Sequence, residues 1–124
     1  MKDIEVKDVT EVNEDERRIM KAIFNGNFVA KQLLFFELKK NSELGGHYHD
    51  YEEIFYVIKG QLDYLLIEVK TGKKINFSVK EGQKIFIPAG FYHKAFAKKG
   101  TIFIGVTESE FISPEINNLP YKND

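Results

Sequence analysis

Three histidines and one glutamate have the residue types and the spacing of a metal site. The chain contains only three histidines, and two of them stand in the triplet His47-Tyr48-His49. Because side chains alternate between the two faces of a β-strand, both imidazoles of the triplet would lie on one face, about 7 Å apart along the backbone. Glu53 keeps the same parity if extended geometry continues through Tyr51. Two imidazoles and one carboxylate from a single stretch of chain could then hold one divalent cation.

The third histidine, His93, follows the turn sequence Pro88-Ala89-Gly90. Proline removes a ladder donor and glycine permits a sharp reversal, so the chain is expected to turn there and to continue as a new strand. Antiparallel winding could bring that strand across a barrel from His49, although the spacing alone does not establish the approach. Glu52 is the competing acid, but adjacent acids face opposite sides of a strand. The parity of the histidine triplet selects Glu53.

The elements expected around these residues are short strands. Phenylalanine and tyrosine number 11 and 6, and they lie in runs rich in Ile, Leu and Val, which favours strands over helices. Asn25-Gly26 is a hairpin signal between the runs 18–24 and 28–39, while residues 14–24 also fit a helical stripe and stay open between helix and strand. Further strands are expected at 53–59, 61–69, 75–79, 84–87, 92–98 and 101–106, arranged as a meander with turns at Gly60, Thr71-Gly72-Lys73 and Gly100.

Composition bounds the class of protein. A chain of 124 residues, 43% hydrophobic and 30% charged, is long enough for one core. A net charge of -1 builds no field that would attract nucleic acid or an anionic membrane. Cysteine is absent, so any metal site would use nitrogen and oxygen ligands. We see no signal-peptide core and no membrane-spanning run, so the cytoplasm is the expected location.

The residues singled out above resemble the two sequence motifs of the cupin family. The stretch from Gly46 to Glu53, followed by Gly60, is similar to the first motif, HxHxxxE and then six residues to a glycine. Gly82, Pro88, Gly90 and His93 keep every spacing of the second motif, and Ala97 replaces the asparagine expected four residues after the histidine.

The resemblance implies an all-β fold, the double-stranded β-helix or jelly-roll barrel of the cupins. Residues 1–124 would form a single domain, with the barrel at about 28–107, an N-terminal hairpin or arm at 1–27 and a C-terminal arm at 108–124. It also implies one divalent transition metal ion held by His47, His49, Glu53 and His93 near one mouth of the barrel. Fe, Mn, Ni, Zn and Co all suit such ligands, and four of them leave two positions of an octahedral ion open. A metal-free pocket of the same shape is the alternative.

The cupin fold hosts many reactions and also proteins that only bind ligands, so the resemblance does not decide whether this protein is an enzyme. Three shorter segments resemble nucleotide-sugar epimerases and ketoisomerases of the same superfamily, at residues 15–18, 45–49 and 110–121. They favour an isomerase or epimerase acting on a small carbohydrate or nucleotide-sugar. In that interpretation His47 or His49 removes a proton beside a carbonyl, and Tyr51 or Tyr48 returns one. Those enzymes usually work without metal, whereas Glu53 and His93 follow the metal-binding branch.

Two other functions stay open. The first is an Fe(II)-dependent dioxygenase that binds substrate and O₂ side by side. The second is a non-enzymatic barrel that binds or senses a small ligand. In all cases the expected partner is a small molecule rather than nucleic acid or a membrane.

A homodimer is also expected, because apolar runs such as 28–36 offer more strand edge than one small barrel needs.

Overall fold

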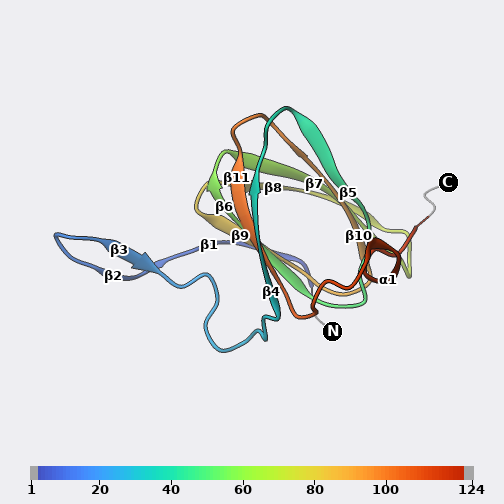
Figure 1. The fold of residues 1–124 in the computed structure, drawn as a ribbon, viewed down its shortest axis with the longest axis horizontal. Coiled ribbons are helices and arrows are strands. Elements are labelled where there is room, and N and C mark those ends of the chain that lie inside the picture. The colour runs from blue at the N-terminus through green and yellow to red at the C-terminus, as the bar shows by residue number, and fades with distance from the viewer. Residues whose placement is uncertain (1–2, 122–124) are drawn as a thin grey trace.

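The computed structural model describes residues 3–121, and within that range the chain forms strands and one short helix (Figure 1). The all-β prediction is confirmed. Two antiparallel sheets make the barrel, a five-stranded sheet in the order β1-β9-β6-β11-β4 and a four-stranded sheet in the order β5-β10-β7-β8. The elements are β1 (Glu5–Asp8), β2 (Glu11–Glu14), β3 (Ile19–Lys21), β4 (Gln32–Glu37), β5 (Ser42–His47), β6 (Glu53–Lys59), β7 (Gln61–Glu68), β8 (Lys74–Lys80), β9 (Gln83–Ile87), β10 (Phe91–Ala97), β11 (Ile102–Thr107) and α1 (Pro114–Asn117).

Successive strands alternate between the two sheets. From β4 to β11 every strand crosses to the sheet opposite its predecessor, except β8, which forms a hairpin with β7. The predicted meander is therefore wrong, because Gly60 and Gly100 are crossing points between sheets and not hairpin turns. Gly60 has a φ of 90°, and a Cβ there would lie 2.6 Å from the hydroxyl oxygen of Thr101. Two crossings approach each other so closely that only glycine fits.

The N-terminal segment divides into a barrel strand and a projecting hairpin. β1 pairs with β9 and so belongs to the five-stranded sheet rather than to an arm. β2 and β3 pair with each other and stand away from the barrel (Figure 1), which settles residues 19–21 as strand. Asn25-Gly26 is not a hairpin turn, because β4 begins only at Gln32 and pairs with β11. No helix within residues 3–121 is long and apolar enough to cross a membrane.

The barrel interior is filled from both sheets by aliphatic side chains. Val57, Leu62, Leu66, Val79 and Ile85 are fully buried and belong to one hydrophobic cluster. Each such side chain contributes roughly 1.5–3 kcal/mol relative to an exposed position. This cluster fixes the positions of β6 and β10, which carry the buried Glu53 and His93 at one end of the barrel.

Candidate metal centre

β5 reaches the site through a β-bulge at Gly45 and Gly46. Both glycines have positive φ angles, 88° and 89°, and the register of β5 against β10 shifts beside them. The extra residue explains why Leu44 and His47, three positions apart, both line the same cavity. A Cβ on Gly45 would lie 2.6 Å from the carbonyl oxygen of His93. Glycine therefore allows the two histidine-bearing segments to approach each other.

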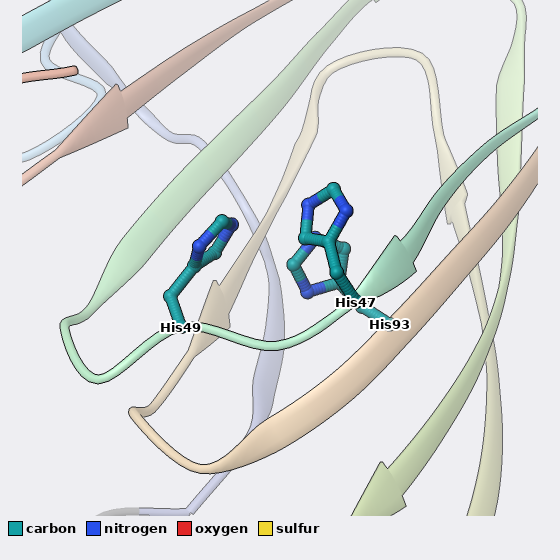
Figure 2. Close-up of side chains that lie close together, drawn as sticks. All are labelled: His47, His49 and His93. Carbon is teal, nitrogen blue, oxygen red and sulfur yellow. The ribbon is translucent and has the colours of Figure 1, made fainter. Parts of the chain in front are cut away.

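The structure brings the three histidines together. His47 ends β5 and is the register partner of His93 on β10, and His49 follows two residues later. One nitrogen from each imidazole lies within 4.8 Å of the others, and Figure 2 shows the three rings gathered in one space inside the barrel. His49 and His93 are buried, and His47 is half-buried.

Glu53 joins the cluster from the opposite sheet. Its Oε1 lies 2.7 Å from Nε2 of His49, and its Oε2 lies 4.0 Å from Nε2 of His93. The continuous strand that parity assumed does not exist, since β5 ends at His47 and β6 begins at Glu53. Glu53 instead points inward as the first residue of β6. Glu52 lies in the connection and donates its backbone N–H to a carboxylate oxygen of Glu108 at 2.6 Å.

A hydrogen bond to the C-terminal segment fixes the tautomer of His49. Its Nδ1 lies 2.5 Å from the carbonyl oxygen of Asn117, which can only accept, so Nδ1 carries a proton. The ring of His49 also stacks on Tyr51, with centroids 4.6 Å apart and an angle of 18°. In the neutral imidazole the lone pair of Nε2 then faces a carboxylate oxygen of Glu53. Two acceptors at that separation require a proton or a cation between them.

The electrostatics of the three imidazoles differ. Burial lowers the pKa of His47 to about 4, and it also lowers the pKa of His93. Burial would lower the pKa of His49 as well, but its hydrogen bond to Glu53 and the nearby negative charge outweigh burial and raise it. His47 and His93 are therefore neutral at neutral pH and offer lone pairs, as metal ligands must.

The donor set fits a divalent cation. Among the described residues, Oε2 of Glu53 is buried and has no hydrogen-bond partner, and leaving such an acceptor unsatisfied costs about 1–3 kcal/mol or more. A cation beside Glu53 would satisfy that oxygen and replace the proton needed between Glu53 and His49. Imidazole nitrogen and carboxylate oxygen suit divalent transition metals.

The cluster opens onto a cavity of about 460 Å³. Most of its wall is apolar, and within residues 3–121 neither a lysine nor an arginine lines it. Tyr51, which was predicted beside the histidines, is part of the wall. The remaining side chains that shape it are Gln32, Leu34, Phe36, Phe55, Ala95, Phe103, Thr107, Phe111 and Asn118. A larger hollow of about 600 Å³ at the crossings near Gly60 and Gly100 contains none of the histidines. The side chains that could bind a metal therefore line the smaller cavity.

Two features of the site were missed from the sequence. The Gly45-Gly46 pair is itself a sequence signal for a bulge, because consecutive glycines in a strand indicate positive φ angles. Asn117 gave no comparable signal, because it lies 68 positions from His49 in a tail that showed no periodic pattern. Only the folded chain places that carbonyl beside the imidazole.

Comparisons with known proteins agree with this architecture. A family model described as Cupin matches residues 24–113. Acireductone dioxygenase of Rattus norvegicus is 33% identical over an alignment of 85 residues, and the match covers 64% of this chain but only 42% of the length of that protein.

Solved structures of sugar enzymes have the same fold. The TDP-quinovose 3,4-ketoisomerase of Campylobacter jejuni has a TM-score of 0.78 at 14% identity, over 95% of this chain and 94% of that one. The dTDP-4-dehydrorhamnose 3,5-epimerase of Bacillus anthracis has a TM-score of 0.76 at 11% identity, over 90% and 75%. The family match covers most of the chain, including every strand that carries the histidine cluster, and the chain therefore belongs to the cupin family.

Proposed function

We propose that this protein binds one divalent transition metal ion through His47, His49, Glu53 and His93. The observation that carries the proposal is the convergence of three imidazole nitrogens within 4.8 Å beside a buried carboxylate oxygen that lacks a hydrogen-bond partner among the described residues. Metal analysis of the protein purified without added metal tests it directly. Near one equivalent is expected for the unaltered protein, and a metal-free preparation that takes up no added Fe(II), Mn(II), Ni(II), Zn(II) or Co(II) would refute it.

The reaction that the site supports best is a metal-dependent dioxygenation of a small organic substrate. A bound ion would supply Lewis-acid and redox chemistry, and the four side chains would leave two positions of an octahedral ion open. The apolar wall around Phe55 and Phe103 excludes water and holds the carbon skeleton of the substrate. The identity shared with a dioxygenase supports this assignment.

Charge limits the substrate. Among the described residues no lysine or arginine lines the cavity, so a diphosphate group would find no side-chain counter-charge from them. A neutral or singly charged molecule with oxygen donors fits better than a nucleotide-sugar. O₂ consumption with Fe(II) and a panel of small enediols, catechols and diketones tests the dioxygenase, and Zn(II) should not support turnover. Turnover that is equally fast with Zn(II) and consumes no O₂ would exclude it.

An isomerase or epimerase of a small carbohydrate is the second candidate. Glu53, His49 and Tyr51 form a connected acid–base cluster, through a 2.7 Å contact and a stacked pair of rings, which suits removal of a proton beside a carbonyl and its return to a neighbouring carbon. The fold shared with the ketoisomerases supports this alternative. Such a reaction exchanges a substrate C–H with solvent deuterium and needs no O₂. Tight binding of a ligand with neither activity would instead indicate a sensor or storage barrel.

We further propose a homodimer. The outer face of β4 carries Leu33 and Phe35, which are 68% and 65% exposed, and the projecting hairpin carries exposed Ile19 and Met20. Apolar side chains of this size on a free sheet edge are typical of an interface between copies. Light scattering should report a dimer, and Phe35→Glu should shift it to a monomer. A monomer for the unaltered protein at micromolar concentration would contradict the proposal.

A further inference from the structure

The segment that follows β11 is pinned along the edge of the candidate metal centre. Residues 108–119, here called the strap, run from the end of β11 through α1 (Figure 1). At the start of the strap the backbone N–H of Glu108 donates to the carbonyl of Glu52 at 3.2 Å. At its end Tyr48 and Leu119 exchange two backbone hydrogen bonds of 3.0 and 2.8 Å. The strap thus brackets the connection between β5 and β6, which carries His49.

Asn117 organises the strap from within. Its side chain is nearly inaccessible, with 4% of the residue exposed, and its Oδ1 accepts hydrogen bonds from the backbone N–H groups of Ile112 and Ser113 at 2.7 and 3.1 Å. Its Nδ2 donates to the carbonyl of Glu110 at 3.0 Å and to the hydroxyl of Tyr51 at 3.3 Å. Both donors and both acceptor sites of the amide are used. The side chain of Asn117 therefore fixes where its own backbone lies.

That backbone meets the histidine cluster. The carbonyl oxygen of Asn117 accepts the Nδ1 proton of His49 at 2.5 Å, and Tyr51, which accepts from the Asn117 amide, stacks on the same imidazole. Together they fix the tautomer and the plane of the ring. Nε2 of His49 then faces Glu53, the position that a shared ion requires. Contacts of this kind to the second ring nitrogen orient metal-binding histidines and raise their basicity.

We propose that the strap is a positioning element of the metal centre and that Asn117 is its positioning residue. The inference rests on the proposed metal site. By thermodynamic reciprocity, an ion that binds the oriented His49 more tightly must also stabilise the docked strap.

The first test compares Zn²⁺ affinity, measured by competition with a chromophoric chelator. Asn117→Ala keeps the backbone carbonyl but removes the four hydrogen bonds that hold it, and it should weaken Zn²⁺ binding about 10- to 100-fold. Ile116→Ala is the matched control, because that side chain lies on the same helix and is 59% exposed, and its affinity should not change. Tyr51→Phe removes one hydrogen bond to Asn117 and keeps the stacked ring, so its loss should be smaller and in the same direction.

A second readout separates positioning from general stability. Nitrogen-15 spectra of the histidine rings in the Zn²⁺-loaded protein should show His49 protonated only at Nδ1, and Asn117→Ala should show a mixture of ring states while the backbone spectrum stays folded. If Asn117→Ala does not fold, Tyr51→Phe carries the same test. Wild-type affinity together with an unchanged His49 tautomer in the variant would overturn the inference.

The reciprocal test uses the unaltered full chain. Limited proteolysis should cut the strap several-fold more slowly when Zn²⁺ is present. Two failures can be told apart. If the protein binds none of Fe(II), Mn(II), Ni(II), Zn(II) or Co(II), the metal proposal fails and the strap inference falls with it. If it binds Zn²⁺ but strap cleavage is unaffected, only the strap inference is overturned.

Discussion

The two ends of the barrel interior are built from the same strands, but one end buries apolar side chains and the other buries polar ones. β6 turns Glu53 and, four residues later, Val57 to the inside, and β10 does the same with His93 and Ala97. The packed end consists of apolar side chains that exclude water, whereas three imidazoles and a carboxylate lie at the polar end. Burying such groups is unfavourable unless they are paired or bind an ion. Apolar burial at the packed end therefore stabilises the fold and offsets the unfavourable burial of polar groups at the other end.

The largest expected effect lies at the packed end. Leu62 is fully buried, so Leu62→Ala should leave a void and lower the free energy of unfolding by about 2–5 kcal/mol. Chemical denaturation of the metal-free protein measures this change. Ile58→Ala removes a comparable aliphatic group from a side chain that is 43% exposed, and it should cost far less. Equal losses for the two variants would show that the packed end is not the source of stability.

The next effect should appear only at the polar end and only with metal. An ion that binds the folded chain alone stabilises it by about 2.7 kcal/mol at a free concentration 100 times the dissociation constant. His93→Ala should abolish this gain while costing the metal-free protein less than Leu62→Ala, because His93 lies in a polar cluster that is only partly satisfied. Thermal unfolding with and without Zn²⁺ measures both quantities.

Glu52→Ala and Glu53→Ala form the matched pair for that measurement. Glu53 lies among the histidines, whereas Glu52 lies in the connection beside Glu108. Loss of the Zn²⁺-dependent stabilisation is expected for Glu53→Ala and not for Glu52→Ala. The reverse result would reassign the acidic ligand and break the contrast between the two ends.

The sequence predicted which residues would form the cluster, but not the path that the chain takes between the two sheets to bring them together. His47, His49 and His93 follow from motif spacing, and the parity argument selected Glu53. That argument assumed one strand running from His47 to Glu53, whereas the chain leaves one sheet and enters the other. Local alternation cannot reveal such a crossing, since strand order depends on contacts between residues far apart in sequence. The glycine crossings mistaken for hairpins were missed for the same reason.

The smallest predicted effect concerns the bulge that aims His47 into the cavity. Gly45 combines a φ of 88° with a Cβ position 2.6 Å from the carbonyl oxygen of His93. Gly45→Ala should therefore cost about 1–2 kcal/mol from the left-handed backbone alone. It should also weaken Zn²⁺ binding, because β5 and β10 must separate beside two of the histidines.

Gly82→Ala separates these two contributions. Gly82 has a φ of 83°, but nothing lies within 4 Å of its Cβ position, so the substitution brings the same backbone strain without a clash. In denaturant titrations of the metal-free protein, both variants should lose about the same stability from backbone strain. Gly45→Ala should lose more in total, because its Cβ also displaces the neighbouring strand. Zn²⁺ affinity should fall for Gly45→Ala and stay unchanged for Gly82→Ala. If both variants bind Zn²⁺ like the unaltered protein, the polar end tolerates a shift of β5, and the close approach at Gly45 serves packing rather than the metal centre.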